Sequence, residues 1–205
     1  MGNNEFEVDA LLVRLMEFHH GKLVIQIPRY LFLLEQFIKE KGNDITKIST
    51  VSRNELFEYF IYSKLNIEDK LGSNEAKKRV LEKLALVMEI YQTNSISRDE
   101  LMTFFDDIKS DLKTAIIVQG NFNLFIDKTV LWASGTSLDK IEFENTEFQE
   151  YLAAKEITRF TDPVRATFHF TADQNINELH PSWLNTLNFL VDLMPSLLEP
   201  LVEFS

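Results

Sequence analysis

Apolar residues recur every three or four positions along most of the chain, the spacing that places them on one face of an α-helix. The clearest stripe consists of Val80, Leu81, Leu84, Val87, Met88 and Tyr91. Comparable stripes predict helices over residues 8–19, 30–40, 56–65, 101–108, 112–118 and 181–194, with another beginning at Pro195. The pattern predicts a mainly α protein.

Residues that start helices precede several of these stripes. Pro28 opens the helix over 30–40, because the first helical N–H groups have no partner within the helix and proline lacks one. Residues 52–55 and 97–100 both read Ser-x-x-Glu, a capping box in which serine and glutamate pair with each other's backbone N–H. A similar cap, with Thr146 first and Gln149 closing it, predicts a helix that ends near Phe160.

Two short runs of strand-forming residues interrupt the helices. Residues 130–132 and 141–143 predict a loose hairpin around the polar residues 134–137. Three short helices followed by a two-stranded wing form the winged-helix arrangement, a relative of helix-turn-helix. The predicted domains are a small helical domain (1–70), a winged-helix domain (71–161) and the start of a C-terminal helical region (162–205), with the last boundary at Asp162-Pro163.

Composition supports packed helices and restricts the partners. The 205 residues include 17 Phe but only 6 Gly, 5 Pro and no Cys, which excludes disulfides and thiolate sites. The net charge of −11 disfavours nucleic acid and anionic membranes as partners. The densest basic group, residues 77–79, is flanked by Glu75 and Glu82, which predicts a solvated helix face with local ion pairs.

Candidate catalytic and metal-binding residues form no recognised motif. His19, His20, His169 and His180 lack metal-ligand spacing, so no metal is expected. Asp127, Glu142 and Glu144 lack the lysine that a nuclease carboxylate cluster would need. There is no G-x-S-x-G, and the only Gly-Lys, at residues 21–22, is not part of a phosphate-binding loop. We therefore expect no enzyme activity and no cofactor for the chain alone.

No targeting or membrane segment is evident in this sequence. The first residues have neither a basic nor an apolar stretch of the kind found in secretory signals. The longest apolar run, residues 187–204, is interrupted by Asp192, Pro195, Glu199 and Glu203, so it does not read as a membrane span. We expect a cytoplasmic protein.

One segment resembles a known signature. Residues 143–154 match the pattern F-x-H-x-[ST]-F-Q-E-Y-L-A-A at Phe143 and throughout 148–154, with Asn145 at the histidine position and Glu147 at the Ser or Thr position. This pattern ends the winged-helix domain of NACHT proteins, a branch of the STAND signalling NTPases that includes animal NOD-like receptors and bacterial antiphage proteins. Residues 27–34 and 53–60 are similar to the proline-led helix and the R-x-E-L-Y-E-x-F segment of that family.

The resemblance, which covers about residues 8–160, implies a role in a nucleotide switch. It implies that an upstream core binds ATP or ADP with Mg, that Pro28 contacts adenine, and that Asn145 replaces a histidine that reaches the ADP phosphate. Asn can donate a hydrogen bond but carries no charge. On the alternative reading, Pro28 only opens its helix and Asn145 is only a turn or capping residue.

Three functional hypotheses follow from these observations. The first is the regulatory region of a STAND NTPase, which couples nucleotide state to oligomerisation, for example in antiphage defence; its partners are the upstream core and C-terminal sensor repeats. The second is a winged-helix nucleic-acid binder, although Lys113 is the only basic residue in its candidate helix over 110–118. The third is a free-standing helical adaptor that binds proteins.

The isolated chain is expected neither to bind ATP tightly nor to hydrolyse it, because the backbone cradle for phosphates is missing. Calorimetry and a phosphate-release assay on the purified chain check this expectation. Micromolar ATP binding, or turnover that persists through purification, would contradict it.

Overall fold

The computed structural model describes residues 28–41, 51–65, 73–108, 122–134, 139–173 and 178–204. The chain divides into two compact units, residues 1–63 and 64–205, and each is described by itself. The helices predicted over 8–19 and 112–118 lie outside the described residues, as do Lys113 and the Gly-Lys pair at 21–22.

The first unit contains α3 (Pro28–Lys41) and most of α5 (Arg53–Leu65). Helix α3 begins at Pro28, as predicted. The capping box before α5 is also confirmed, because the Ser52 N–H donates to Glu55 Oε2 over 2.7 Å and the Glu55 N–H donates to Ser52 Oγ over 3.2 Å. The two helices meet through an edge-to-face contact of Phe37 with Tyr59, whose ring centroids lie 5.1 Å apart.

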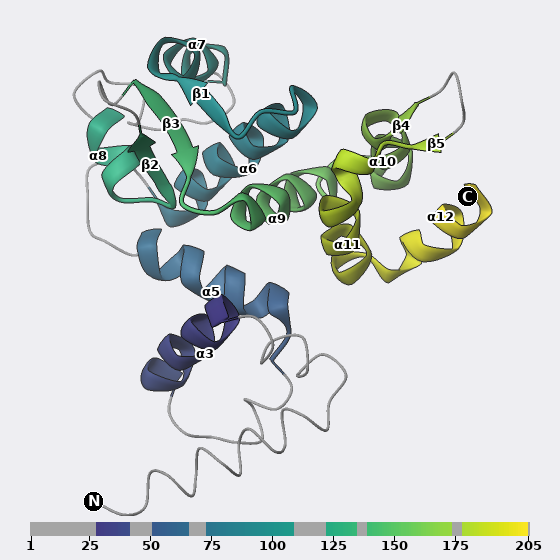
Figure 1. Cartoon of the computed structure of the whole chain (residues 1–205), viewed down its shortest axis with the longest axis horizontal. Helices are drawn as coiled ribbons and strands as arrows, with labels where there is room; N and C mark the ends of the chain where they lie inside the picture. The colour runs from purple at the N-terminus through teal and green to yellow at the C-terminus, as the bar shows by residue number, and fades with distance from the viewer. Residues whose placement is uncertain are drawn as a thin grey trace, which may run out of the picture. The chain divides into compact units, whose positions relative to one another are not determined.

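The second unit opens with helices around a small sheet (Figure 1). Its elements, in chain order, are α6 (Asn74–Ile90), β1 (Ser95–Ser97), α7 (Arg98–Ile108), α8 (Phe122–Asp127), β2 (Leu131–Ser134), β3 (Lys140–Phe143) and α9 (Thr146–Ile157). The strands are antiparallel in the order β1-β3-β2. The predicted hairpin is therefore confirmed, with β2 beginning one residue later than expected.

Strand β1 was not predicted. Ser97, expected only as a helix cap, pairs with Lys140 of β3 and also accepts a hydrogen bond from the Glu100 N–H over 3.2 Å. A strand of three residues is too short to show an alternating pattern, so the sequence indicates only the cap.

The C-terminal segment adds α10 (Pro163–Thr171), β4 (Ala172–Asp173), β5 (Glu178–Leu179), the 3₁₀ turns η3 (Pro181–Trp183) and η4 (Pro195–Leu197), α11 (Leu184–Leu193) and α12 (Leu198–Phe204). Sequence analysis missed α10 and the β4–β5 pair. Asp162, expected only as a boundary, caps α10 by accepting from the Arg165 N–H. The compact unit over 64–205 spans this position.

Helix α9 lies between α6 and α11, as Figure 1 shows. Phe148 and Tyr151 are buried, and the Tyr151 ring meets Phe189 of α11 edge-to-face at 5.6 Å. Ala153 and Ala154 are fully buried, and such small side chains allow neighbouring helices to approach closely. The mainly α fold class is confirmed, and its core is organised around α9.

Within the part of the chain that the structure describes, no helix is both long enough and apolar enough to cross a bilayer.

Replacing Phe148 with Ala should lower the free energy of unfolding by about 3–5 kcal/mol, because the side chain is 97% buried (3% exposed) and its removal leaves a cavity. Urea unfolding of the purified chain measures the change. Trp132→Ala is the comparison variant: Trp132 is 50% exposed and its removal leaves no enclosed cavity, so its loss should cost clearly less than that of Phe148. A Phe148→Ala effect as small as that of Trp132→Ala would contradict the proposed core.

Candidate functional site

Asn145, the residue at the signature's histidine position, is the N-cap of α9. Its Oδ1 accepts from the Glu147 N–H over 3.2 Å, and its Nδ2 donates to Glu147 Oε2 over 3.2 Å. The expected cap, with Thr146 first and Gln149 closing it, is therefore wrong. Because the helix begins one residue earlier, Phe148 occupies the third helical position and Gln149 is free for contacts elsewhere.

Capping restricts what else Asn145 can do. Its amide has two N–H groups, and the contact with Glu147 occupies one of them. The neighbouring Glu144 carboxylate is paired with Lys64 over 2.8 Å. A phosphate at this position would approach one neutral donor flanked by two carboxylates, which is a weaker attraction than a histidine cation would offer.

Pro28 and Asn145 belong to different units. Each is therefore considered within its own unit. Pro28 begins α3, and the position of its side chain lies outside what the structure describes. Helix opening by Pro28 and capping by Asn145 are the roles that the geometry shows directly.

Gln149 joins α9 to α6 and to the loop that follows α6. Its Nε2 donates to Glu89 Oε1 over 2.8 Å and to the Thr93 carbonyl over 3.1 Å. From α11, the Thr186 hydroxyl donates to the other carboxylate oxygen of Glu89 over 3.1 Å. Three helices thus meet at one carboxylate. The sequence shows no sign of this cluster, because Glu89 is separated from Gln149 by 60 positions and from Thr186 by 97.

Two groups in the polar cluster are destabilised by their burial, the Glu89 carboxyl and the Gln149 side-chain oxygen. Burial raises the pKa of the Glu89 carboxyl, and the hydrogen bonds from Gln149 and Thr186 only partly oppose this effect. The Gln149 Oε1 atom is buried and has no hydrogen-bond partner. A buried polar atom without a hydrogen-bond partner lowers the stability of the folded state, so the cluster fixes the arrangement of the helices at a cost in stability.

A buried ionic network also joins α6 to α9. Glu82 accepts from Arg79 Nη1 over 2.6 Å within α6 and from Arg159 Nε over 2.8 Å, just after α9. Glu156 of α9 pairs in turn with Arg79 and, over 3.5 Å, with Lys83. Glu82 therefore pairs with cations from both sides of the junction, and Glu156 of α9 pairs with two cations of α6.

The predicted solvated face at residues 77–79 is wrong. The exposed fractions are 1% for Lys77, 3% for Lys78 and 0% for Glu82. The Lys77 ammonium donates to the Leu65 carbonyl over 2.7 Å, and Lys78 lies 3.9 Å from Glu82. Local charge spacing suggested exposed pairs, whereas tertiary packing around α6 removes these groups from water.

The network raises the pKa of the Arg159 guanidinium. Burial by itself lowers the pKa of the Arg159 guanidinium, but the hydrogen bond and charge of Glu82, together with the charges of Glu75 and Glu156, raise it above its usual value. The cations already face carboxylates, so the network is suited to fixing helix positions and not to holding an anion.

The remaining candidate residues are dispersed. Glu142 accepts from Ser134 Oγ over 2.6 Å, and Asp127 is exposed at the end of α8. His169 is exposed on α10, and His180 caps η3. Among the described residues, no group of three His, Asp or Glu side chains is placed to hold a metal ion; His19 and His20 lie outside those residues.

Comparison of the chain with protein-family models, with curated proteins and with solved structures finds no match. The resemblance of residues 143–154 to the NACHT signature therefore rests on those residues themselves.

Replacing Glu89 with Gln should change the pH dependence of stability. Because the folded pKa of Glu89 is raised above 4.5, protonation favours the folded state, and this contribution is lost as pH rises through the folded pKa. The free energy of unfolding of Glu89→Gln minus that of the unchanged protein should therefore increase from pH 4.5 towards neutral pH.

Urea unfolding at a series of pH values measures that difference. The exposed Glu178→Gln is a matched control, and its difference should not vary in this way. A Glu89→Gln difference that is constant with pH would contradict the raised pKa of the buried Glu89 carboxyl.

Proposed function

We propose that this chain is the regulatory helical region of a STAND-type NTPase and couples nucleotide state to oligomerisation. The observation that carries the proposal is the position of the signature-like helix α9. It begins directly after the hairpin, and it packs against α6 on one side and α11 on the other. A switch region needs such an element, because a displacement at one end must reach distant contacts.

The polar contacts of α9 support this coupling. Gln149 and Glu89 connect its first half to α6, and Thr186 extends the connection to α11. Glu156 connects its last turn to α6. Buried hydrogen bonds and ion pairs are made or broken as discrete states, so they favour movement of α9 and its neighbours as one body.

The nucleotide contacts are assigned to Pro28, towards adenine, and to Asn145, towards phosphate. The remaining N–H of Asn145 is the group that would meet a diphosphate while Oδ1 continues to cap α9. The ATP or ADP, with its Mg, would be held by a core ahead of this region in the same polypeptide, and sensor repeats would follow it. The proposal also includes a cytoplasmic location and a role in antiphage defence.

Nucleic-acid binding is the less favoured alternative. Lys140 on the hairpin lies between the acidic residues Asp139 and Glu142, and Glu144 follows them. Phosphate contacts dominate binding to DNA, and this hairpin offers few of them. A free-standing adaptor would have the same fold, and it differs in lacking an NTPase core. Sequencing the complete reading frame distinguishes the regulatory region from the adaptor, because only the regulatory region would follow a phosphate-binding loop.

The substitution Asn145→Asp in the complete protein tests the phosphate contact. Asp accepts from the Glu147 N–H as Asn does, so the cap persists. It also places a negative charge towards phosphate. Loss of a charge-assisted hydrogen bond costs about 1.5–3 kcal/mol, so ADP affinity should fall by about ten- to a hundredfold and basal activity should rise.

Two further variants separate sensing from capping. Asn145→His should preserve or tighten ADP binding, whereas Asn145→Ala should lose both the contact and the cap. Unfolding of the isolated variants measures the local contacts alone. Asp keeps the bond from the Glu147 N–H but loses the donation to Glu147 Oε2, so we expect its stability to lie between that of Asn and that of Ala, which should cost about 1 kcal/mol. If ADP affinity and basal activity are the same in all three variants, Asn145 is only a capping residue.

A further inference from the structure

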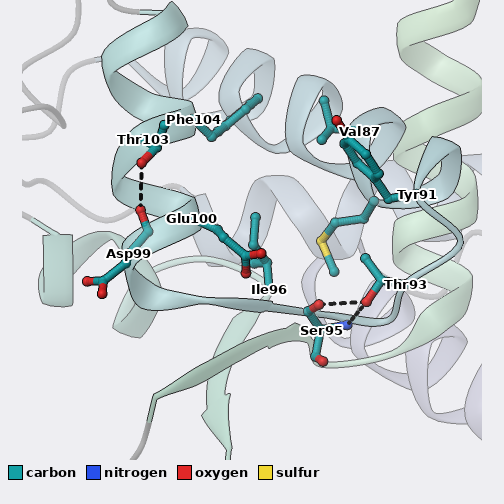
Figure 2. Close-up of a pocket in the computed structure, with 10 residues that line it drawn as sticks. Val87, Tyr91, Thr93, Ser95, Ile96, Asp99, Glu100, Thr103 and Phe104 are labelled. Carbon is teal, nitrogen blue, oxygen red and sulfur yellow. Dashed lines mark hydrogen bonds between the residues drawn. The ribbon is translucent and has the colours of Figure 1, made fainter.

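A groove of about 820 Å³ lies between the last turns of α6 and the start of α7, with the 91–97 segment along its base. Figure 2 shows the side chains that surround it. Val87 and Met88 of α6, Ile96 of β1 and Phe104 of α7 supply its apolar surface. Its volume falls within the usual range for binding sites in proteins.

Local hydrogen bonds hold the walls of the groove in place. The Thr93 hydroxyl donates to the Ser95 carbonyl over 2.7 Å and accepts from the Ser95 N–H over 3.2 Å, as Figure 2 shows. Gln149 anchors the Thr93 carbonyl from α9. On the α7 side, Thr103 Oγ1 donates to the Asp99 carbonyl over 3.0 Å. A groove formed in advance spares an occupant the cost of ordering it.

The electrostatics of the groove favour a positively charged occupant. The charged lining residues that the structure describes, Asp99 and Glu100, are both acidic and both exposed. The groove also lies between the C-terminus of α6, which carries partial negative charge, and the N-terminus of α7, which carries partial positive charge, so the attraction for cations rests on the two carboxylates. The net charge of −11 adds a long-range attraction for cationic partners.

The base of the groove is poorly suited to an added β-strand. Strand β1 is at the edge of its sheet. The groups that a new strand would need are already bonded, however: the Ser95 N–H and carbonyl by Thr93, and the Ser97 N–H by Glu100 Oε2 over 2.8 Å. A helix satisfies its own backbone groups and offers only side chains, so it fits such a groove.

The rim offers an anchor for such a helix. Tyr91 is 77% exposed beside the buried Met88. Tyrosine is common among residues that dominate binding energy, and methionine adapts to different apolar side chains. We infer that this groove binds a basic amphipathic helix of a partner protein, with apolar side chains against Val87, Ile96 and Phe104 and Lys or Arg facing Asp99 and Glu100. The inference goes beyond the nucleotide switch and does not rest on it.

Synthetic peptides test the inference directly. The probe is a labelled helical peptide of about 15 residues with leucines on one face and lysines on the other, long enough to form a helix on binding. The control peptide carries glutamate in place of lysine. Fluorescence anisotropy with the full chain should show saturable binding of the lysine peptide that weakens as salt is added. Equal binding of the glutamate peptide would overturn the inference.

Variants locate the binding on the protein surface. Tyr91→Ala should weaken the lysine peptide by about tenfold, the effect of losing about 1.4 kcal/mol. Trp132→Ala removes another exposed aromatic, on β2, and should leave affinity unchanged. Asp99→Asn should weaken binding severalfold and reduce its salt dependence. If Tyr91→Ala and Trp132→Ala bind the peptide as tightly as the unchanged chain, the attraction is a general effect of charge and the inference is wrong.

Methionine methyl NMR supplies a readout that does not depend on affinity. The Met88 methyl signal should shift as peptide is added, because Met88 lines the groove. Met194, at the end of α11, lies outside the groove lining and should not shift. Binding that leaves the Met88 signal unchanged would place the peptide elsewhere and overturn the inference.

Discussion

The carboxylate of Glu82 is fully buried, and the positions of the neighbouring helices depend on how it is paired. On α6, Arg79 and Glu82 lie about one turn apart. Across the junction, Glu156 and Arg159 lie about one turn apart in the opposite order of charge. In the observed register Arg79 therefore pairs with Glu156, and Arg159 pairs with Glu82. A shift of one helical turn, about 5.4 Å, would break both of these contacts and leave the buried Glu82 carboxylate with partners from α6 alone, which is unfavourable in the interior.

This constraint gives α6 three different tasks along its length. Its first half carries the ionic network, Glu89 near its end forms the hydrogen-bonded link to α9 and α11, and its last turn, with Tyr91, forms a wall of the acidic groove. Gln149 connects the Glu89 link to the groove, because the same Nε2 atom donates to both Glu89 and the Thr93 carbonyl. A displacement of α9 would therefore move the segment that carries Thr93 and change the shape of the groove.

The structure also changes how the signature-like segment is understood. Phe148 and Leu152 are buried, and Gln149 is a buried link between helices and not part of a cap. Asn145 holds the start of α9, so any contact with phosphate must coexist with capping. Under the proposed function, a phosphate contact by Asn145 would couple ligand binding to the stability of the start of α9.

The sequence by itself determined the features that depend on neighbouring residues. Helical periodicity, the two Ser-x-x-Glu capping boxes, the opening of α3 at Pro28 and the pairing of β2 with β3 all arise from contacts within a few positions. It did not reveal the burial of Lys78 and Glu82, the third strand, or the meeting of Glu89 with Gln149 and Thr186. Whether a charged residue faces water or another helix is decided by tertiary packing, which joins residues many positions apart and leaves no periodic signal along the chain.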